Sequence, residues 1–430
     1  MAVIVWLTIF VTSFALGYPL AFGMFLGAVA YVILSHINLA TILNIMVIQY
    51  EGNYELLAVP LFIFTAKVMN ASRLTDRLFK FAGSFVGPVR GGLGHVNVIA
   101  NMIFAGMSGS EIADISGLGL MEVKAMEDAG YDKPFSCALS ASAATLGPII
   151  PPSIPMVIYA VISGTSIGYL FLGGIGPGVI LAACLMVWIG IISKKRNYPV
   201  GHWYKLGEFF RSLFDSFLVI LAPVMLLGGI YGGVFTPTEA AAVVSVYALF
   251  LSLVVYRTVG LKTVYKVVVE SVVATGFTSF IIGCALLFGY AMAREQIPAE
   301  IANFFVGLGV TQSKVLVLLS LNVLFLFLGA FIDATASLLI VIPIILPLVQ
   351  AAHIDPVHFG VVVVLNLMIG LSTPPYGEAP IIISRLTDTP LPAVIRETLK
   401  FIVFMIAALA IISIFPNTVL WIPHLAGYKG

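Results

Sequence analysis

Long apolar runs dominate this chain of 430 residues, and only glycines, prolines and short charged stretches interrupt them. A helix that crosses a bilayer needs about 20 apolar residues. The alternating polar positions that an outer-membrane barrel requires are rare. The pattern therefore predicts an all-α polytopic integral membrane protein. The apolar segments lie near 2–17, 19–35, 44–69, 93–120, 134–163, 169–192, 212–233, 238–256, 267–292, 314–350, 359–387 and 401–422.

Composition narrows the class further. Hydrophobic residues make up 60% of the chain and charged residues 10%, against about 25% charged in a typical soluble protein. The net charge of +1 and the lack of a basic cluster argue against nucleic-acid binding. Neither a phosphate-binding loop nor a hydrolase motif is present, so we expect no nucleotide and no enzyme activity.

The positions of Lys and Arg predict the orientation, because cytoplasmic loops carry an excess of both. The stretches 67–90 and 194–211 each contain five basic residues and one acidic residue, so both should be cytoplasmic. If 93–120 and 134–163 both crossed the bilayer completely, 169–192 would be the third crossing after 67–90, and 194–211 would lie outside. We therefore expect 93–120 to be a re-entrant hairpin that turns in its polar centre. The stretch 73–90 fits either an amphipathic interfacial arm or a charged loop.

A weak internal repeat appears at an offset of 223 residues. Phe104-Ala105-Gly106 falls on Phe327-Leu328-Gly329, and 147–153 falls on 370–376 with a Pro-Pro pair in each. The equivalent of 67–90 is 290–313, which holds one basic and two acidic residues and should therefore lie on the opposite side. These features predict an inverted-repeat secondary transporter, in which each half contains a re-entrant hairpin and a broken helix.

The hairpin tips and helix breaks are the candidate binding sites. Unwound backbone inside a membrane persists only where protein, water or an ion satisfies it. Carbonyl and hydroxyl oxygens suit Na⁺, while the N-terminus of a half-helix suits a carboxylate. The candidate Na⁺ ligands are Ser108, Gly109, Thr145, Gly147, Asp333, Thr335, Gly370, Ser372 and Thr373. The candidate substrate ligands are Ser110, Ser153, Asp333, Tyr376 and Glu378.

Structural roles compete with these assignments. Ser110 and Asp333 are also suited to capping the helices that return from the tips. Glu111 and Asp114 fit either ion or proton binding or the first turn of a helix. Glu239, which follows Thr236-Pro237-Thr238, is better interpreted as a helix-capping residue.

Four motifs in combination resemble a known family over nearly the whole chain. They are the tip 104–114, the acidic turn 126–132, the segment 147–153 followed by Ile158-Tyr159, and the segment 235–240. Together they look like the large membrane subunit of tripartite ATP-independent periplasmic (TRAP) transporters. Both the sialic-acid and the dicarboxylate members are similar, and no motif decides between them.

The resemblance implies an elevator-type importer in the bacterial inner membrane that couples uptake of a small organic carboxylate to Na⁺. Its partners would be a separate small subunit with four helices and a periplasmic substrate-binding protein. It also implies five units: scaffold helices in 1–43, a first transport repeat in 44–192, a loop and scaffold pair in 193–266, a second transport repeat in 267–400, and a scaffold helix in 401–430. The main alternative is a stand-alone Na⁺/dicarboxylate symporter. An ion channel and an intramembrane enzyme are more distant alternatives.

Overall fold

The computed structural model describes the whole chain except residues 49–51, 73, 87, 202–205, 308–312 and 376. Across the described residues the regular structure is helical, and the β-pairing is limited to an isolated bridge between Arg90 and Val200. Within the described part of the chain, seven helices are long and apolar enough to cross a bilayer, and six shorter apolar helices have 10–17 residues. The predicted class, an all-α polytopic membrane protein, is confirmed.

The first half of the chain alternates long helices with short irregular ones. Its elements are α1 (Ala2–Ala15), α2 (Leu20–Leu34), α3 (Ala40–Leu43), the π-helix η1 (Asn44–Ile48), the 3₁₀-helix η2 (Tyr54–Leu57), α5 (Ala58–Ala71), α6 (Leu74–Gly83), α7 (Gly92–Ser108), α8 (Glu111–Asp114), the π-helix η3 (Ile115–Gly119), α9 (Leu120–Asp128), α10 (Lys133–Ala144), α11 (Ile154–Ser163) and α12 (Ile167–Lys195).

The second half begins with three long helices. Its elements are α13 (Leu206–Tyr231), α14 (Pro237–Phe250), the π-helix η4 (Leu251–Val255), α15 (Leu261–Arg294), α16 (Ile297–Gly307), α17 (Lys314–Gly329), α18 (Ala334–Ala351), α19 (Pro356–Leu371), α20 (Glu378–Thr387), α21 (Leu391–Ile414) and α22 (Asn417–Leu425).

Helix boundaries follow the sequence offset of 223 residues. Helices α6 and α16 begin at 74 and 297, α8 and α18 begin at 111 and 334, and α10 and α19 begin at 133 and 356. The peptide bonds Pro151–Pro152 and Pro374–Pro375 are both cis. The residue matches therefore mark two segments that start their helices in the same register.

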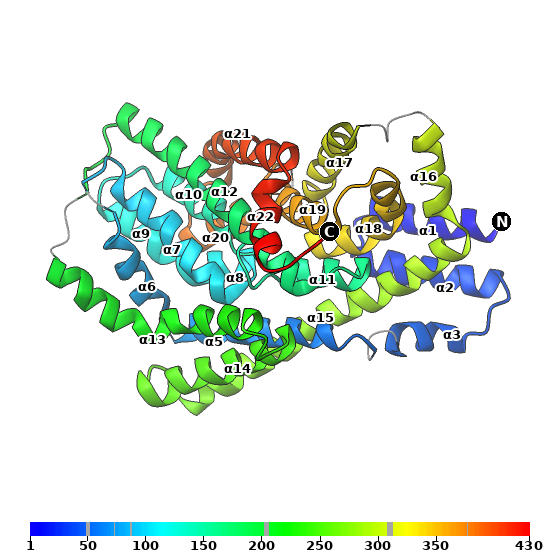
Figure 1. Ribbon diagram of the computed structural model, residues 1–430, viewed down its shortest axis with the longest axis horizontal. Helices are drawn as coiled ribbons and strands as arrows, with labels where there is room; N and C mark the ends of the chain where they lie inside the picture. The colour runs from blue at the N-terminus through cyan, green and yellow to red at the C-terminus, as the bar shows by residue number, and fades with distance from the viewer. Residues whose placement is uncertain (49–51, 73, 87, 202–205, 308–312, 376) are drawn as a thin grey trace.

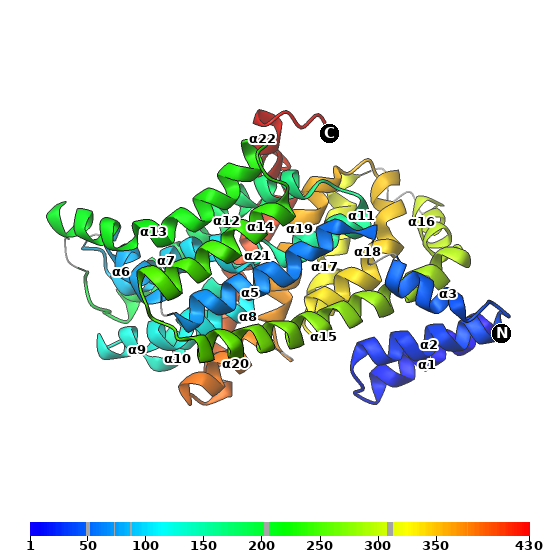
Figure 2. The same cartoon turned by 90° about the horizontal axis from the view of Figure 1, so that it is seen from below.

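Helices α5, α14 and α15 lie side by side along one edge of the molecule (Figures 1 and 2). Helices α1 and α2 pair with each other, and α2 packs on the long helix α15. The rest of the body contains the two helix–turn–helix segments, α7 to α9 and α17 to α18, together with α10, α12, α19 and α21. The site described below lies between this body and the edge formed by α5 and α15.

Some predicted boundaries were wrong, and charges explain the largest error. The last apolar segment was expected to start at 401, but α21 starts at Leu391 and includes Arg396, Glu397 and Lys400. Glu397 accepts hydrogen bonds from Arg196 and Lys400, both at 2.7 Å, so these charges are paired and the helix continues through them. In its described residues, the segment expected at 44–69 is divided into two short elements, η1 and η2, and α5.

Two local interpretations are settled by contacts. Helix α6 buries Leu74, Leu78 and Phe81 and packs on α7 and α13, so the stretch 73–90 is not a plain charged loop. Glu239 forms a capping box with Thr236, because Thr236 N donates to Glu239 Oε2 at 2.8 Å and Glu239 N donates to Thr236 Oγ1 at 3.3 Å. The predicted capping role of Glu239 is confirmed.

Candidate functional site

The first helix–turn–helix segment turns at Gly109 and Ser110, between α7 and α8. Gly109 has φ +63, in the left-handed region that glycine adopts without a Cβ penalty. Its carbonyl accepts a hydrogen bond from Ile154 N at 3.3 Å. A Cβ at Gly109 would lie 2.8 Å from the carbonyl oxygen of Pro152. The first tip therefore lies directly against the segment 145–153, which separates α10 from α11.

The second segment turns at 330–333, between α17 and α18. Asp333 caps α18, because its Oδ1 accepts a hydrogen bond from Ala336 N at 3.2 Å. A Cβ at Gly370 would lie 2.7 Å from Gly329 Cα, so α17 crosses α19 closely just before the second helix break. Glycine at both positions permits this crossing. The second tip and the second break are thus held together by backbone contact.

The breaks supply several of the predicted ligands. Thr145 donates to Ser142 O at 2.6 Å, and Ser153 donates to Pro148 O while capping α11. Thr373 donates to Ile369 O at 2.7 Å. Ser372 donates to Glu111 Oε1 at 3.4 Å, which links the second break to the first tip. Tyr376 lies outside the described residues.

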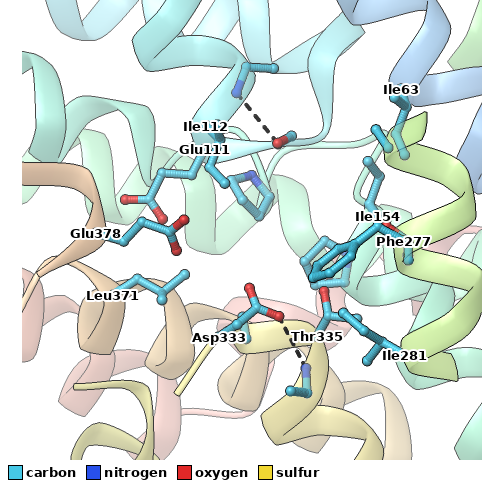
Figure 3. A pocket seen from close by; sticks show the side chains of 18 of the residues that line it. Ile63, Glu111, Ile112, Ile154, Phe277, Ile281, Asp333, Thr335, Leu371 and Glu378 are labelled. Carbon is cyan, nitrogen blue, oxygen red and sulfur yellow. Dashed lines mark hydrogen bonds between the residues drawn. The ribbon is translucent and has the colours of Figure 1, made fainter. Parts of the chain in front are cut away.

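The two tips meet at a cavity of about 850 Å³. Figure 3 shows the carboxylates of Glu111, Glu378 and Asp333 along one side of it, and Phe277 and Ile281 of α15 on the other. The predicted ligands that line the cavity are Ser108, Gly109, Ser110, Asp333, Thr335 and Glu378. Those that do not line it are Thr145, Gly147, Ser153, Gly370, Ser372 and Thr373.

Ser110 and Asp333, for which capping and ligand roles were both open, cap the helices that follow the tips. Ser110 Oγ accepts a hydrogen bond from Ala113 N at 3.5 Å, as Asp333 does from Ala336 (Figure 3). Both residues nevertheless line the cavity. Each keeps acceptor capacity beyond its cap, since a hydroxyl has two lone pairs and a carboxylate two oxygens. Capping and ligand binding are therefore compatible at these two positions.

Asp114, for which the sequence left ion or proton binding and a first-turn role open, lies in a buried environment. Its side chain is fully buried, neither carboxylate oxygen makes a hydrogen bond of good geometry, and the Ser108 hydroxyl lies beside it. The buried Ser108 hydroxyl and Glu111 Oε2 make no such hydrogen bond either. A Cβ at Gly147 would overlap the Asp114 carboxylate, so the first break passes directly over it. The signal in the sequence was an acidic residue in the middle of an apolar hairpin.

The sequence model of one protein family, the DctM component of the tripartite ATP-independent periplasmic transporters, matches residues 7–418. The chain belongs to this family. It is a TRAP transporter large permease, and the predicted resemblance is confirmed. This family membership and the apolar helices identify the permease as a multi-pass protein of the bacterial inner membrane.

Two similar relatives of the permease have names that specify different cargo. It is 44% identical over 412 residues to the sialic acid TRAP transporter large permease SiaM of Vibrio cholerae, with 95% of each chain covered. It is 39% identical over 385 residues to the C4-dicarboxylate TRAP transporter large permease DctM of Pseudomonas aeruginosa, with 90% of each covered. All of these names describe transporters, not enzymes.

A solved structure shares the fold of the permease. The YdaH transporter of Alcanivorax borkumensis superposes with a TM-score of 0.62 at 14% sequence identity, over 88% of this chain and 89% of that one. At this identity the likeness is evidence for the fold alone. The arrangement of helices is therefore also found in a transporter with little sequence in common.

Proposed function

We propose that the permease imports a small organic carboxylate of the sialic-acid or C4-dicarboxylate class and couples this import to Na⁺. The observation that carries the proposal is that two helix–turn tips, each packed against a helix break, meet at one cavity that is lined by the unpartnered oxygen atoms of Ser108 and Glu111. The names of the relatives supply the class of substrate.

The buried group at the first tip is the better supported cation site. A carboxylate without a partner is costly in a membrane interior, and a bound cation removes that cost. Asp114 and Ser108 supply a carboxylate and a hydroxyl, and the adjacent break supplies backbone around Gly147 and Thr145. Oxygen ligands of this kind suit Na⁺, which would travel as the co-transported ion.

The second tip offers an equivalent set of oxygens. Ser337 occupies the position of Asp114 at the offset of 223, and its buried hydroxyl also lacks a partner. Asp333, Thr335 and the break residues Gly370, Ser372 and Thr373 complete the candidate group. We propose this group as the second Na⁺ site.

The substrate carboxylate would bind between the tips. Helices α18 and α20 both begin at the cavity, and the N-terminus of a helix attracts an anion. Ser110, Asp333 and Glu378 face the cavity, whereas Ser153 lies behind the first tip in hydrogen bonds of its own. Asp333 and Glu378 would accept hydrogen bonds from substrate hydroxyl or amide groups.

The movement we propose is of the elevator type. In this proposal the two hairpins are re-entrant and the two halves of the chain have inverted topologies. The hairpins and broken helices would move together past a stationary scaffold. The repeats 44–192 and 267–400 would supply the moving part, and 1–43, 193–266 and 401–430 the remainder. Helices α5 and α15 fall within these repeats, but α5 packs on α14 and α15 packs on α5 and α2, so these two helices would stay with the scaffold while the tips slide past them.

Two partners complete the proposed system. A small four-helix membrane subunit would join the scaffold, and a periplasmic binding protein would deliver the substrate. Such partners are implied by the tripartite family, in which the permease is one of three components. The small subunit would be a separate chain.

Reconstitution tests this function against the stand-alone symporter. The permease and the small subunit are reconstituted in proteoliposomes, and an inward Na⁺ gradient is imposed across the membrane. Uptake of labelled sialic acid or succinate is then measured with and without the binding protein. We expect uptake only with all three proteins and Na⁺. Uptake by the permease alone would identify a stand-alone symporter, and uptake without Na⁺ would contradict the coupling.

A further inference from the structure

One wall of the cavity is formed by facing stripes of α5 and α15. On α5 the stripe contains Ile63, Lys67 and Asn70, which recur at helical spacing and all line the cavity. On α15, Phe277 and Ile281 line the cavity, and Glu270 lies two turns before Phe277. This wall lies opposite the acidic side formed by the tips (Figure 3).

Lys67 is the sole basic residue among the described residues that line the cavity. The acidic residues lining it are Glu111, Asp333 and Glu378. A carboxylate substrate that enters this space is therefore repelled by the side chains of the tips unless cations offset them. Lys67 is the fixed positive charge that the protein itself offers to such a substrate.

The present partner of Lys67 holds it only weakly. Lys67 Nζ lies 3.4 Å from Glu270 Oε2, and the two side chains remain 33% and 45% exposed. An ion pair with this exposure is screened by water and contributes little stability. An ammonium group has three donors, so the pair with Glu270 leaves donors free. An incoming carboxylate can therefore replace Glu270 at small cost.

Asn70 adds a second polar group on the same face. Its Nδ2 donates to Ala113 O at 3.0 Å, so α5 contacts the first tip one helical turn from Lys67. The other amide atom, Oδ1, is buried and has no hydrogen-bond partner. Lys67 is thus placed next to the tip where the substrate is proposed to bind.

We propose that Lys67 recognises the substrate carboxylate, and that Glu270 holds its ammonium group when the cavity is empty. This inference rests on the proposed transport of an organic anion and names the residue that selects for the negative charge. Lys67 belongs to α5, whereas the tips belong to the proposed moving part. When the tips move relative to α5, the substrate carboxylate is therefore separated either from Lys67 or from the tips.

A purely structural role for the pair makes a different prediction. If Lys67 and Glu270 only tie α5 to α15, then removing either partner breaks the same contact and has the same effect. If Lys67 recognises the substrate, loss of Lys67 weakens binding whereas loss of Glu270 frees the ammonium group. The two single variants therefore separate the roles.

The experiment measures binding and transport on the same variants. The purified complex of the permease with its small subunit is titrated with sialic acid and with succinate by isothermal titration calorimetry, with and without Na⁺. The variants are Lys67→Gln, Lys67→Arg and Glu270→Gln, with Lys262→Gln as control because Lys262 is exposed on α15 away from the cavity. Thermal melting checks that each variant is folded, and uptake kinetics follow in proteoliposomes.

We expect Lys67→Gln to weaken binding at least about tenfold, the size of a lost charge-assisted hydrogen bond, with the Na⁺ dependence unchanged. Lys67→Arg should retain most of the affinity, and Glu270→Gln should bind as tightly as the wild type or more tightly. Equal losses in Lys67→Gln and Glu270→Gln, or no loss in Lys67→Gln, would overturn the inference.

Failure of the proposed function gives a different result. A wild-type complex that binds a carboxylate but shows no Na⁺-driven uptake would refute the coupling, while the binding series still decides the role of Lys67. A wild-type complex that binds neither probe would overturn both proposals.

Discussion

Ser108 differs from most buried serines in the permease in what its hydroxyl contacts. Ser252, for example, donates to Ala248 O at 2.7 Å within its own helix. The Ser108 hydroxyl is fully buried at the end of α7 and has no partner. It lies beside the buried Asp114 carboxylate, so a cation bound at the first tip would contact both oxygens.

Ser108→Ala should therefore raise the Na⁺ concentration for half-maximal uptake, by about fivefold if one neutral ligand is lost. Ser252→Ala is the matched control, since it removes a buried hydroxyl that already has a partner. Uptake in proteoliposomes over a series of Na⁺ concentrations makes the comparison. An identical Na⁺ dependence in both variants would mean that Ser108 has no part in the cation site.

Asp333 caps α18 and also lines the cavity, so its two roles need a substitution that removes only one. Asn is as good an N-cap as Asp but carries no charge. Asp333→Asn should keep the melting temperature near that of the wild type while raising the half-saturating Na⁺ concentration about tenfold. If both quantities stay unchanged, Asp333 is a cap alone.

At the scale of elements, each helix break touches a hairpin through glycine. Gly109 contacts the first break, Gly147 leaves room for Asp114, and Gly329 meets Gly370 at the second break. These contacts leave no space for side chains. The hairpins and breaks therefore form one packed unit, in which glycine permits the approach of the backbone.

Gly147→Ala tests this packing, because the new methyl group would overlap the Asp114 carboxylate. Overpacking of this kind costs about 1–3 kcal/mol, and here it displaces a proposed ligand. We expect Na⁺-dependent uptake to be largely lost. Gly190→Ala, in the interior of α12 with open space around it, should leave uptake unchanged. Normal uptake by Gly147→Ala would argue against a cation site at Asp114.

A charge cluster joins three other elements. Arg196, just after α12, contacts Asp132 at 2.9 Å before α10 and Glu397 at 2.7 Å in α21. Burial alone lowers the pKa of Arg196, but hydrogen bonds with Glu397 and Tyr198 outweigh this and raise the pKa. The guanidinium group therefore stays charged throughout the physiological range.

Arg196→Met should destabilise the permease by about 2 kcal/mol, between the values for exposed and buried pairs, because Glu397 is left partly buried with one cation fewer. The measurement is the unfolding midpoint in detergent. Lys133→Met is the control, since Lys133 lies 3.8 Å from Glu127 in a more exposed pair. Equal midpoints for the two variants would contradict a stabilising role for the cluster.

At the scale of the whole molecule, the proposed movement requires α5 to separate from the first tip. Asn70 on α5 donates to Ala113 O and occupies the space beside Gly117. This contact therefore joins the first hairpin to the cavity wall that α5 and α15 form. A covalent link at this place should hold the two parts in one position.

We expect the double variant Asn70→Cys/Gly117→Cys to lose uptake after oxidation and to regain it with dithiothreitol. Its background replaces Cys137, Cys184 and Cys284, the three native cysteines. Each single cysteine variant is a control for oxidation without a link. A cross-linked permease that transports normally would rule out movement at this contact.

The sequence by itself determined the class of the protein and much of its internal order. The length of the apolar segments, the scarcity of charge and the basic residues in the loops all reflect the free energy of transferring side chains between water and lipid. That free energy depends on the residues of each segment and not on distant contacts. The offset of 223 was also readable, since glycine and proline mark backbone positions that other residues cannot occupy. The tips and both breaks were located in this way.

Tertiary structure alone decided which of these residues meet. Ser153 and Gly370 belong to the predicted motifs yet lie away from the cavity, while Lys67 and Asn70 of α5 line it although no motif singled them out. The extension of α21 through its charges likewise depended on Arg196, about 200 residues earlier. Burial and hydrogen-bond partners arise from contacts between distant segments, and such contacts are not encoded in the spacing of residues along one segment.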